Sequence, residues 1–314
     1  MRVLFWGTPD FALPSLRALL GEDHEIVGVV TQPDRRAGRG RRLRPSLVKR
    51  EALEEGIEVL QPERASDEEF IAEIAALEPE ISVVVAYGQI LKKEVLELPT
   101  HGSINVHASL LPELRGAAPI NWAIIRGYEE TGVTIMQMTE GLDSGPILAR
   151  AAEPIAPDER ASDLWARLSE LGAGLLIETL TLIEAGAVEP IEQDDEAATY
   201  APRLTREDAR IDWSQDATTV DRLIRGLDAV PGAWTTWNGW DLKLFRPQPL
   251  PDYEHDAVPG TILETSPSDS TRGLLVASGE GALYLREVQP GGRRRMTTAD
   301  WVRGRGAKPG DLFE

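Results

Sequence analysis

The sequence predicts an α/β protein in which a mainly parallel sheet is followed by a second, smaller β-barrel domain. Three observations lead to this prediction. The first half alternates short apolar runs with amphipathic segments, the composition changes after residue 187, and the last third holds short apolar runs between turns rich in proline and glycine. Alternating strands and helices are typical of βαβ units, and closely spaced short strands are typical of barrels.

In the first half, each strand candidate is followed by an amphipathic helix candidate. Ile81–Tyr87 is almost continuously apolar, as expected of a central strand buried on both faces. Leucines at 164, 168, 171 and 175 recur at helical spacing and predict a long helix that ends near Gly186. The other strands are expected at Val3–Trp6, Ile26–Thr31, Ile57–Leu60, Ser103–His107 and Val133–Met138, and helices at Pro9–Leu20, Ser46–Glu55, Asp67–Leu77, Lys92–Leu98 and Pro119–Arg126.

The second half begins after an acidic stretch without apolar periodicity, which reads as a linker. We expect a first domain over 1–187, a linker over 188–207 and a second domain over 208–314. Five short strands fit an OB-like barrel. They are expected at Ala233–Trp237, Leu242–Phe245, Thr261–Leu263, Leu274–Ala277 and Leu283–Val288, after one helix at Ala217–Leu227.

Composition excludes several classes of protein. The chain has no cysteine, so it has neither disulfides nor a thiolate nucleophile. No apolar stretch approaches the ~20 residues that cross a bilayer, and a strand-like run at Arg2–Trp6 takes the place of a signal peptide. We therefore expect a cytoplasmic protein without a membrane partner. A monomer is also expected, although composition does not decide the oligomeric state.

The net charge of −19 argues against a polyanionic partner, but its distribution does not. Eight basic residues and one acid lie between Pro33 and Arg50, and a second basic cluster lies between Arg286 and Lys308. Two basic patches on an acidic body are compatible with selective polyanion binding. Scattered, solvated arginines are the alternative, and the acidity could also reflect a saline host.

The pattern that carries chemistry lies in the strand Ser103–His107. Residues i and i+2 of a strand share a face, so Asn105 and His107 point together while Ile104 and Val106 point away. Taken alone, such a pair is more often structural than catalytic. The next strand, Val133–Met138, ends in a glycine-flanked loop that carries Asp143.

If these two strands are adjacent and parallel, the carboxylate of Asp143 reaches His107 where both strands end. Amide and imidazole donors suit the oxyanion of an acyl transfer to an amine, and the carboxylate would orient the imidazole and help to move the amine proton. Ser109 lacks a nucleophile-elbow context, and the four histidines have no metal-ligand spacing. Direct attack by an amine, without a metal, is the consistent mechanism.

Several motifs together resemble the 10-formyltetrahydrofolate-dependent formyltransferase family. They are Asn105–His107, Ser109–Pro112, Arg115–Pro119 and Gly141–Asp143. Further segments are similar to its methionyl-tRNA formyltransferase branch, at Gly7–Phe11, Thr31–Asp34, Ala37–Gly40, Val133–Met138, Thr199–Pro202 and Arg210–Trp213. The resemblance implies a Rossmann-like catalytic domain, a linker and an OB-like barrel. It also implies transfer of a formyl group from 10-formyltetrahydrofolate to the α-amine of methionyl-initiator tRNA.

The resemblance assigns roles residue by residue. Asn105, His107 and Asp143 match the catalytic residues of the family. Its folate-contacting loop corresponds to Ser109, Leu110, Leu111 and Pro112, and its pterin-pocket segment to Gly88, Gln89, Ile90 and Leu91. For these aliphatic residues, plain core packing remains the alternative.

The resemblance also gives the basic clusters a use in tRNA binding. The loop with Arg39, Arg41 and Arg42 would enter the acceptor arm, and Arg293, Arg294 and Arg295 would hold the stem. One position departs from the family, because Glu113 stands where a basic residue often follows Leu-Leu-Pro.

Two other functions remain open at this point. One is another 10-formyltetrahydrofolate-dependent formyltransferase or hydrolase acting on a small molecule, such as a sugar nucleotide, glycinamide ribotide or water. The other is a catalytically silent tRNA-binding protein, against which the intact set of Asn105, His107 and Asp143 argues.

Overall fold

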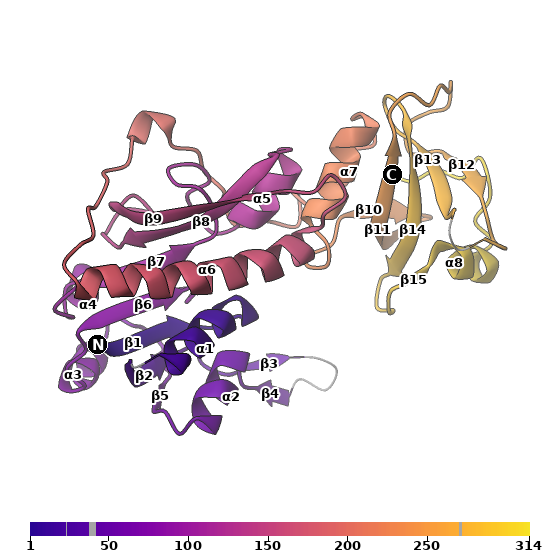
Figure 1. Cartoon of the computed structure of the whole chain (residues 1–314). Coiled ribbons are helices and arrows are strands. Elements are labelled where there is room, and N and C mark those ends of the chain that lie inside the picture. Colours follow the sequence, from indigo (N-terminus) through magenta and orange to yellow (C-terminus); the bar gives the residue numbers. More distant parts are fainter. Residues whose placement is uncertain (23, 38–41, 270–271) are drawn as a thin grey trace. The chain divides into compact units, whose positions relative to one another are not determined.

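The structure is a computed structural model that describes residues 1–22, 24–37, 42–269 and 272–314 (Figure 1). It divides into two compact units. The first comprises residues 1–119, 130–154 and 165–202, and the second comprises residues 120–129, 155–164 and 203–314. Residues 188–202 of the expected linker therefore pack with the first unit.

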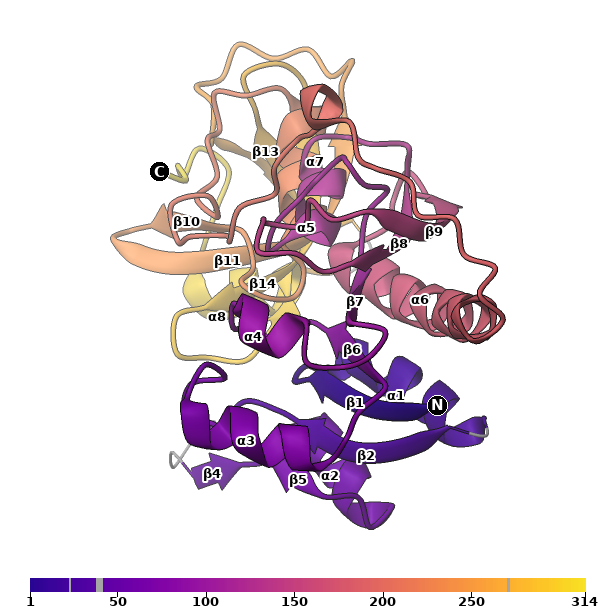
Figure 2. The same cartoon turned by 90° about the vertical axis from the view of Figure 1, so that its left-hand side faces the viewer.

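A seven-stranded sheet forms the centre of the first unit, in the order β5-β2-β1-β6-β7-β8-β9 (Figures 1 and 2). The pairs from β5 to β7 are parallel, which confirms the mainly parallel sheet. The strands are β1 (Arg2–Gly7), β2 (Glu25–Val30), β5 (Val59–Leu60), β6 (Ile81–Val85), β7 (Ser103–His107), β8 (Glu130–Gln137) and β9 (Ile147–Pro154).

The pairing of β7 with β8 corrects one expectation, because these two strands are antiparallel and not parallel. Ile104 pairs with Gln137 and His107 pairs with Thr134, so the end of β8 lies beside the start of β7. The following strand, β9, was not predicted. Its exposed positions alternate with partly buried ones, and alanine and arginine weaken its apolar signal.

Helices cover the sheet where the apolar periodicity places them. α6 (Ala161–Glu184) is the expected long helix. The absence of a side chain at Gly172 allows this helix to approach β7 and β8 closely. A Cβ on Gly172 would lie 2.8 Å from Cγ1 of Val106 and 3.4 Å from Cγ1 of Val133. α6 therefore covers the β7 face that bears Val106. The other helices that the structure describes in this unit are η1 (Asp10–Ala12), α1 (Leu13–Gly21), α2 (Leu47–Glu54), α3 (Glu68–Ala76), α4 (Lys93–Leu96) and η2 (Asp195–Ala197), whereas α5 (Pro119–Ile125) belongs, apart from its first residue, to the second unit.

The basic segment after β2 forms a small hairpin of β3 (Arg35–Ala37) and β4 (Arg42–Arg44). A hydrogen-bonded cluster lies at its base. Nζ of Lys49 donates to Asp34 at 2.9 Å and to Gln61 at 2.6 Å, and the Gln61 amide donates to Asp34 at 2.9 Å. The hydrogen bonds from Gln61 and Lys49 lower the pKa of Asp34.

The second unit contains an antiparallel half-barrel in the order β10-β11-β14-β13-β12, with β15 beside β14. The strands are β10 (Trp234–Trp237), β11 (Trp240–Leu250), β12 (Ile262–Thr265), β13 (Leu274–Ala277), β14 (Ala282–Pro290) and β15 (Met296–Thr297). All five expected strands are present. α7 (Ala217–Gly226) matches the expected helix, whereas α8 (Thr298–Arg305) and β15 were not predicted.

Residues 311–314 pair with both edge strands of the half-barrel. Thr236 and Glu314 exchange two backbone hydrogen bonds of 3.0 Å, and the N–H of Phe313 donates to Gly260 at 2.9 Å. Edge strands with unpaired backbone groups are a liability for a β-protein. This C-terminal segment satisfies groups on β10 and beside β12, and Phe313 fills the core together with Trp213 at a ring distance of 5.7 Å.

Candidate active site

β7 holds Asn105 and His107 on one face, as the alternation predicts. Ile104 and Val106 on the opposite face are 1% and 4% exposed. Asn105 remains partly exposed, and its side chain makes no hydrogen bond within the described part of the chain. His107 is 5% exposed. The site therefore combines one available carboxamide with one enclosed imidazole.

Both ring nitrogens of His107 face oxygen atoms. Nε2 lies 3.1 Å from the carbonyl oxygen of Leu114, to which it donates. Nδ1 lies 3.7 Å from Oδ2 of Asp143. The second separation is within the range of an ion pair but exceeds that of a hydrogen bond. His107 and Asp143 are thus brought together, with the ring held between a carbonyl and a carboxylate.

Asp143 reaches His107 through its loop and not because two strand ends coincide. The last residue of β8 pairs three positions before His107, which corresponds to about 10 Å at ~3.3 Å per residue. The loop after β8 must therefore fold back along β7. Asp143 adopts a φ of +48°, a left-handed conformation that aspartate tolerates better than most residues. Its Oδ2 accepts a hydrogen bond of 2.8 Å from the backbone N–H of Gly116.

Gln193, which lies in the expected linker, holds this loop in place by hydrogen bonds. Its amide nitrogen donates to the carbonyl oxygens of Asp143 and Gly145 at 2.9 and 2.7 Å. Its amide oxygen accepts from Nε and Nη2 of Arg115 at 3.0 and 2.9 Å. Arg115 is only 4% exposed and also pairs with Asp195 at 2.8 Å. The side chain of Gln193 thus links the two loops that approach His107.

The same segment also pairs with the chain after the Leu-Leu-Pro motif. The N–H of Arg115 donates to the carbonyl of Thr199 at 2.8 Å, and the N–H of Ala201 donates to that of Arg115 at 2.7 Å. Between them, Gly116 has a φ of +120°, and a Cβ there would lie 2.7 Å from the carbonyl oxygen of Ala201. Only glycine fits this close approach. We call residues 191–201 the brace segment.

Sequence reasoning missed the brace segment because its signal is not periodic. An acidic, polar stretch reads as a linker when only apolar spacing is considered. The resemblance did include Thr199–Pro202, which lies partly inside it.

The residues of the Leu-Leu-Pro motif divide into buried and half-buried positions. Ser109 is fully buried, and its Oγ donates to the carbonyl of Glu113 at 2.6 Å. Leu111 is also fully buried and packs in the core with Met136 and Ile147. Leu110 and Pro112 are half-buried. The exposed parts of this loop are therefore the ones that can meet a ligand.

The segment after β6 divides in the same way. Leu91 is 4% exposed and belongs to the core, whereas Ile90 is 88% exposed. Gln89 uses its side chain to hold the chain around residues 63–65, accepting from the N–H of Ala65 at 3.0 Å. In the described residues, the backbone groups of Gly88, Gln89 and Ile90 make no backbone hydrogen bond. Exposed Ile90 and these unpaired backbone groups form an exposed edge after β6.

The expected RNA-binding arginines differ in how they are held. Arg39 and Arg41 lie outside the described residues, and only the backbone of Arg42 is described. Arg293 and Arg294 are exposed, and neither side chain has an acidic partner in the part of the chain that the structure covers.

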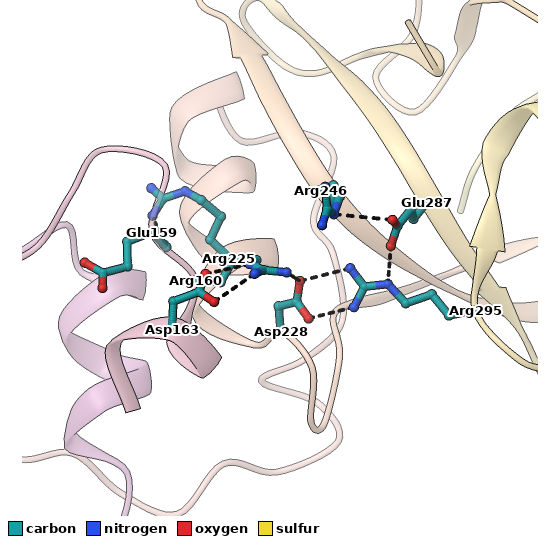
Figure 3. A network of polar contacts seen from close by, with 8 residues as sticks. All are labelled: Glu159, Arg160, Asp163, Arg225, Asp228, Arg246, Glu287 and Arg295. Carbon is teal, nitrogen blue, oxygen red and sulfur yellow. Dashed lines mark hydrogen bonds and ion pairs between the residues drawn. The ribbon is translucent and has the colours of Figure 1, made fainter. Parts of the chain in front are cut away.

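Arg295, by contrast, is part of a network of ion pairs in the second unit (Figure 3). Its guanidinium binds Asp228 at 2.8 and 3.2 Å, also pairs with Glu287, and stacks over Phe245 at 3.9 Å. Asp228 is 3% exposed and lies 3.8 Å from Arg160. The charge of Arg295 is therefore already neutralised within the protein.

The described residues contain no cluster of three or more histidine or acidic side chains placed to hold a metal ion. None of their helices is both long and apolar enough to cross a membrane.

Comparison with known proteins identifies relatives along the whole chain. Residues 1–180 match the formyl transferase family, and residues 203–306 match the formyl transferase C-terminal domain. The methionyl-tRNA formyltransferase of Bacillus velezensis is 45% identical over 313 residues, which cover 99% of this chain and 97% of the relative. That of Trichlorobacter lovleyi is 47% identical over 312 residues, which cover 99% and 96%.

A solved structure shares the fold at low identity. HypX from Aquifex aeolicus in complex with tetrahydrofolic acid aligns with a TM-score of 0.64 at 21% identity. The alignment covers 96% of this chain and 47% of HypX, so this chain spans about half the length of HypX. Because one family match covers more than half of the residues and the bacterial relatives align over nearly all of them, the chain belongs to the formyl transferase family.

Proposed function

We propose that the protein is a methionyl-tRNA formyltransferase, which transfers the formyl group of 10-formyltetrahydrofolate to the α-amine of methionyl-initiator tRNA. The observation that carries this proposal is the convergence of Asn105, His107 and Asp143 at β7. The full-length bacterial relatives, at 45% and 47% identity, support the choice of substrate. The products are N-formylmethionyl-tRNA and tetrahydrofolate.

The edge formed by Gly88, Gln89 and Ile90 fits the folate co-substrate. A pterin ring offers several hydrogen-bond donors and acceptors on a flat apolar body. The free backbone N–H and C=O groups would form hydrogen bonds with the donors and acceptors of the pterin ring. The exposed side chain of Ile90 would pack against the flat face of the ring. Leu110 and Pro112 provide further half-buried surface, whereas Leu91 and Leu111 support the site from the core. The co-substrate brings a formyl carbon that an amine can attack.

Asn105 has the side chain best placed to meet the developing oxyanion. Its carboxamide has no partner to give up within the described chain, so it can donate to the formyl oxygen as the amine attacks. His107 is held differently, because its Nε2–H is donated to the carbonyl of Leu114. For His107 to donate to the substrate, that bond must be exchanged for one to the formyl oxygen.

Asp143 would orient the imidazole and help to take up the proton that the amine loses. Its Oδ2 is fixed by the N–H of Gly116 and lies 3.7 Å from the ring. The loop that carries Asp143 is in turn held by Gln193, which acts as a positioning residue. No covalent intermediate with the protein is needed, since the amine nitrogen bonds directly to the formyl carbon. The bond from that carbon to N10 of the folate then breaks, and N10 takes up the proton that the amine loses.

The proposed partners are initiator methionyl-tRNA and folate, and we propose that the protein acts as a cytoplasmic monomer. Of the basic residues, we assign RNA contacts to Arg39, Arg41 and Arg42 and to Arg293 and Arg294, although Arg39 and Arg41 lie outside the described residues. Arg295 is the weaker candidate because Asp228 and Glu287 already bind it.

The test is formylation by the purified protein with 10-formyltetrahydrofolate. Initiator and elongator methionyl-tRNA and small-molecule amines should be compared, and only the initiator should give formylmethionine efficiently. Asn105→Ala, His107→Ala and Asp143→Asn should each lower kcat by about 100-fold or more, as for loss of an oxyanion donor. His101→Ala, an exposed histidine elsewhere in the first unit, is the matched control. Unchanged transfer in the His107 and Asp143 variants would refute the proposed site.

A further inference from the structure

Two adjoining recesses lined by tryptophan lie on the second unit. The smaller has a volume of about 290 Å³ and is lined by Trp237, Trp240, Trp301, Arg293 and Arg305. The larger has a volume of about 440 Å³ and includes Trp234, Arg206 and Lys243. They share Asp241, Pro290 and Gly291. We call the two together the tryptophan groove.

The smaller recess offers aromatic surface of a kind that is rarely left uncovered. Trp240, at the turn between β10 and β11, is 76% exposed. Trp237 packs edge-on against Trp301 at a ring distance of 4.8 Å, which fixes its orientation. The indole N–H of Trp237 is buried and lacks an acceptor among the described residues. With Trp237 fixed in orientation and Trp240 exposed, the recess is suited to the stacking of a flat aromatic ligand.

The charges around the groove are positive although the chain is strongly acidic. Arg293 and Arg305 are exposed, and in the described part of the chain neither has an acidic partner. The one carboxylate in the smaller recess, Asp241, is bound by Arg206 at 2.6 Å. Arg206 itself stacks over Trp234 at 4.3 Å. The groove thus combines aromatic faces with guanidinium groups free to bind an anion.

We infer that the tryptophan groove binds unpaired nucleotides of the RNA substrate. One base would stack on Trp240 in the smaller recess while Arg293 and Arg305 contact the phosphates on either side. The strand would continue into the larger recess along Arg206 and Lys243. Stacking on aromatic side chains and guanidinium planes is how proteins hold single-stranded RNA, whereas paired bases are not accessible to it. This inference rests on the proposed function, because it assumes that the substrate is an RNA.

The test uses the full-length protein and two labelled RNAs, initiator tRNA and an unpaired octa-adenylate. Trp240→Ala should raise the Kd of both about 5- to 150-fold, the range expected for loss of one base stack. Trp240→Phe retains an aromatic face and should restore most of the affinity. Arg293→Gln and Arg305→Gln should each lower the slope of log Kd against log salt by about 0.7.

Two controls separate a specific groove from general charge. Arg303→Gln removes the same charge from the same helix, but Arg303 pairs with Asp300 and does not line the groove, so Kd should stay within about twofold. A duplex of the same length as the octa-adenylate should bind less tightly than the single strand.

Three results would overturn the inference. They are an unchanged Kd in Trp240→Ala, equal losses in Trp240→Phe and Trp240→Ala, or equal effects of Arg303→Gln and Arg305→Gln. Each would refute RNA binding in the groove without bearing on whether the wild-type protein formylates methionyl-tRNA. Absence of formylation in the wild type would refute the function by itself, whatever the RNA affinities are.

Discussion

Replacement of Gln193 by alanine tests whether the brace segment positions the catalytic loop. The change removes two hydrogen bonds to the loop of Asp143 and two from Arg115. A hydrogen bond contributes about 0.5–1.5 kcal/mol net, and water can replace part of it at this half-buried side chain. Removal of the Gln193 side chain should therefore lower the free energy that holds the loop of Asp143 in place by about 2–3 kcal/mol. At about 1.4 kcal/mol per factor of ten, kcat should fall roughly 30- to 150-fold.

Gln193→Glu separates the two halves of this interaction. The carboxylate would keep its contact with Arg115 but lose both N–H donors to the carbonyls of Asp143 and Gly145. If the loop of Asp143 is what matters, Gln193→Glu should be about as slow as Gln193→Ala. Gln248→Ala, which removes a glutamine bound to Arg286 in the second unit, is the matched control and should leave kcat unchanged.

The assay is kcat at saturating methionyl-tRNA and 10-formyltetrahydrofolate, measured in the wild-type and Asp143→Asn backgrounds. A residue that acts through Asp143 should cost little more once Asp143 is already replaced, because the two effects are coupled. Equal losses in both backgrounds would refute the positioning role, as would a kcat for Gln193→Ala within twofold of the wild type.

Four further predictions concern stability, and the first has a matched control in Gly174→Ala. In a urea titration, Gly116→Ala should lower the free energy of unfolding by about 1–3 kcal/mol, because of the positive φ and the close approach to Ala201. Gly174→Ala adds a methyl group in open space on α6 and should raise the free energy of unfolding by up to about 1 kcal/mol. Tyr87→Phe removes a buried hydroxyl that has no hydrogen-bond partner among the described residues, and burial raises the pKa of this hydroxyl to about 12. The Tm should therefore stay the same or rise, and a clear fall in Tm would contradict this prediction. The hydrogen bonds of Asp34 lower its pKa, so its carboxylate stabilises the fold above the unfolded pKa and loses this effect as the pH falls through the folded pKa. In Asp34→Asn, the free energy of unfolding should therefore fall less steeply with acidification between about pH 2 and 6. An identical pH profile would exclude the Asp34 cluster as a source of acid sensitivity. Arg295→Ala leaves buried Asp228 with Arg160 as its one remaining ion-pair partner among the described residues, so the free energy of unfolding should fall by about 2–4 kcal/mol in chemical denaturation. An unchanged free energy would instead favour an RNA-binding role for Arg295.

The sequence was most informative where one residue type repeats at a fixed spacing. The alternation around Asn105 and His107 predicted both the strand and the face they share, because Ile104 and Val106 need a core on the other side. The leucine spacing predicted α6 in the same way. In both cases burial of apolar surface decides the local structure, and burial leaves a periodic pattern.

Other features could not be read from spacing because they depend on long-range pairing. The direction of β8 is set by how the sheet is completed, and nothing within Glu130–Gln137 distinguishes parallel from antiparallel pairing. The link from Gln193 to Asp143 spans 50 residues and uses polar atoms. The neutralisation of Arg295 by Asp228 spans 67 residues, so counting basic residues overestimated the charge available to RNA.

The interleaving of the two units limits how this enzyme can be dissected. Cutting the chain anywhere between residues 187 and 208 would separate the half-barrel from residues 120–129 and 155–164, which belong to the same compact body. An isolated C-terminal fragment would lose the carbonyl of Glu159 that Arg225 binds at 2.8 Å, and the guanidinium of Arg160 beside Asp228. Exchange of barrels between relatives, in the laboratory or in evolution, therefore has to carry three stretches of sequence together and not one.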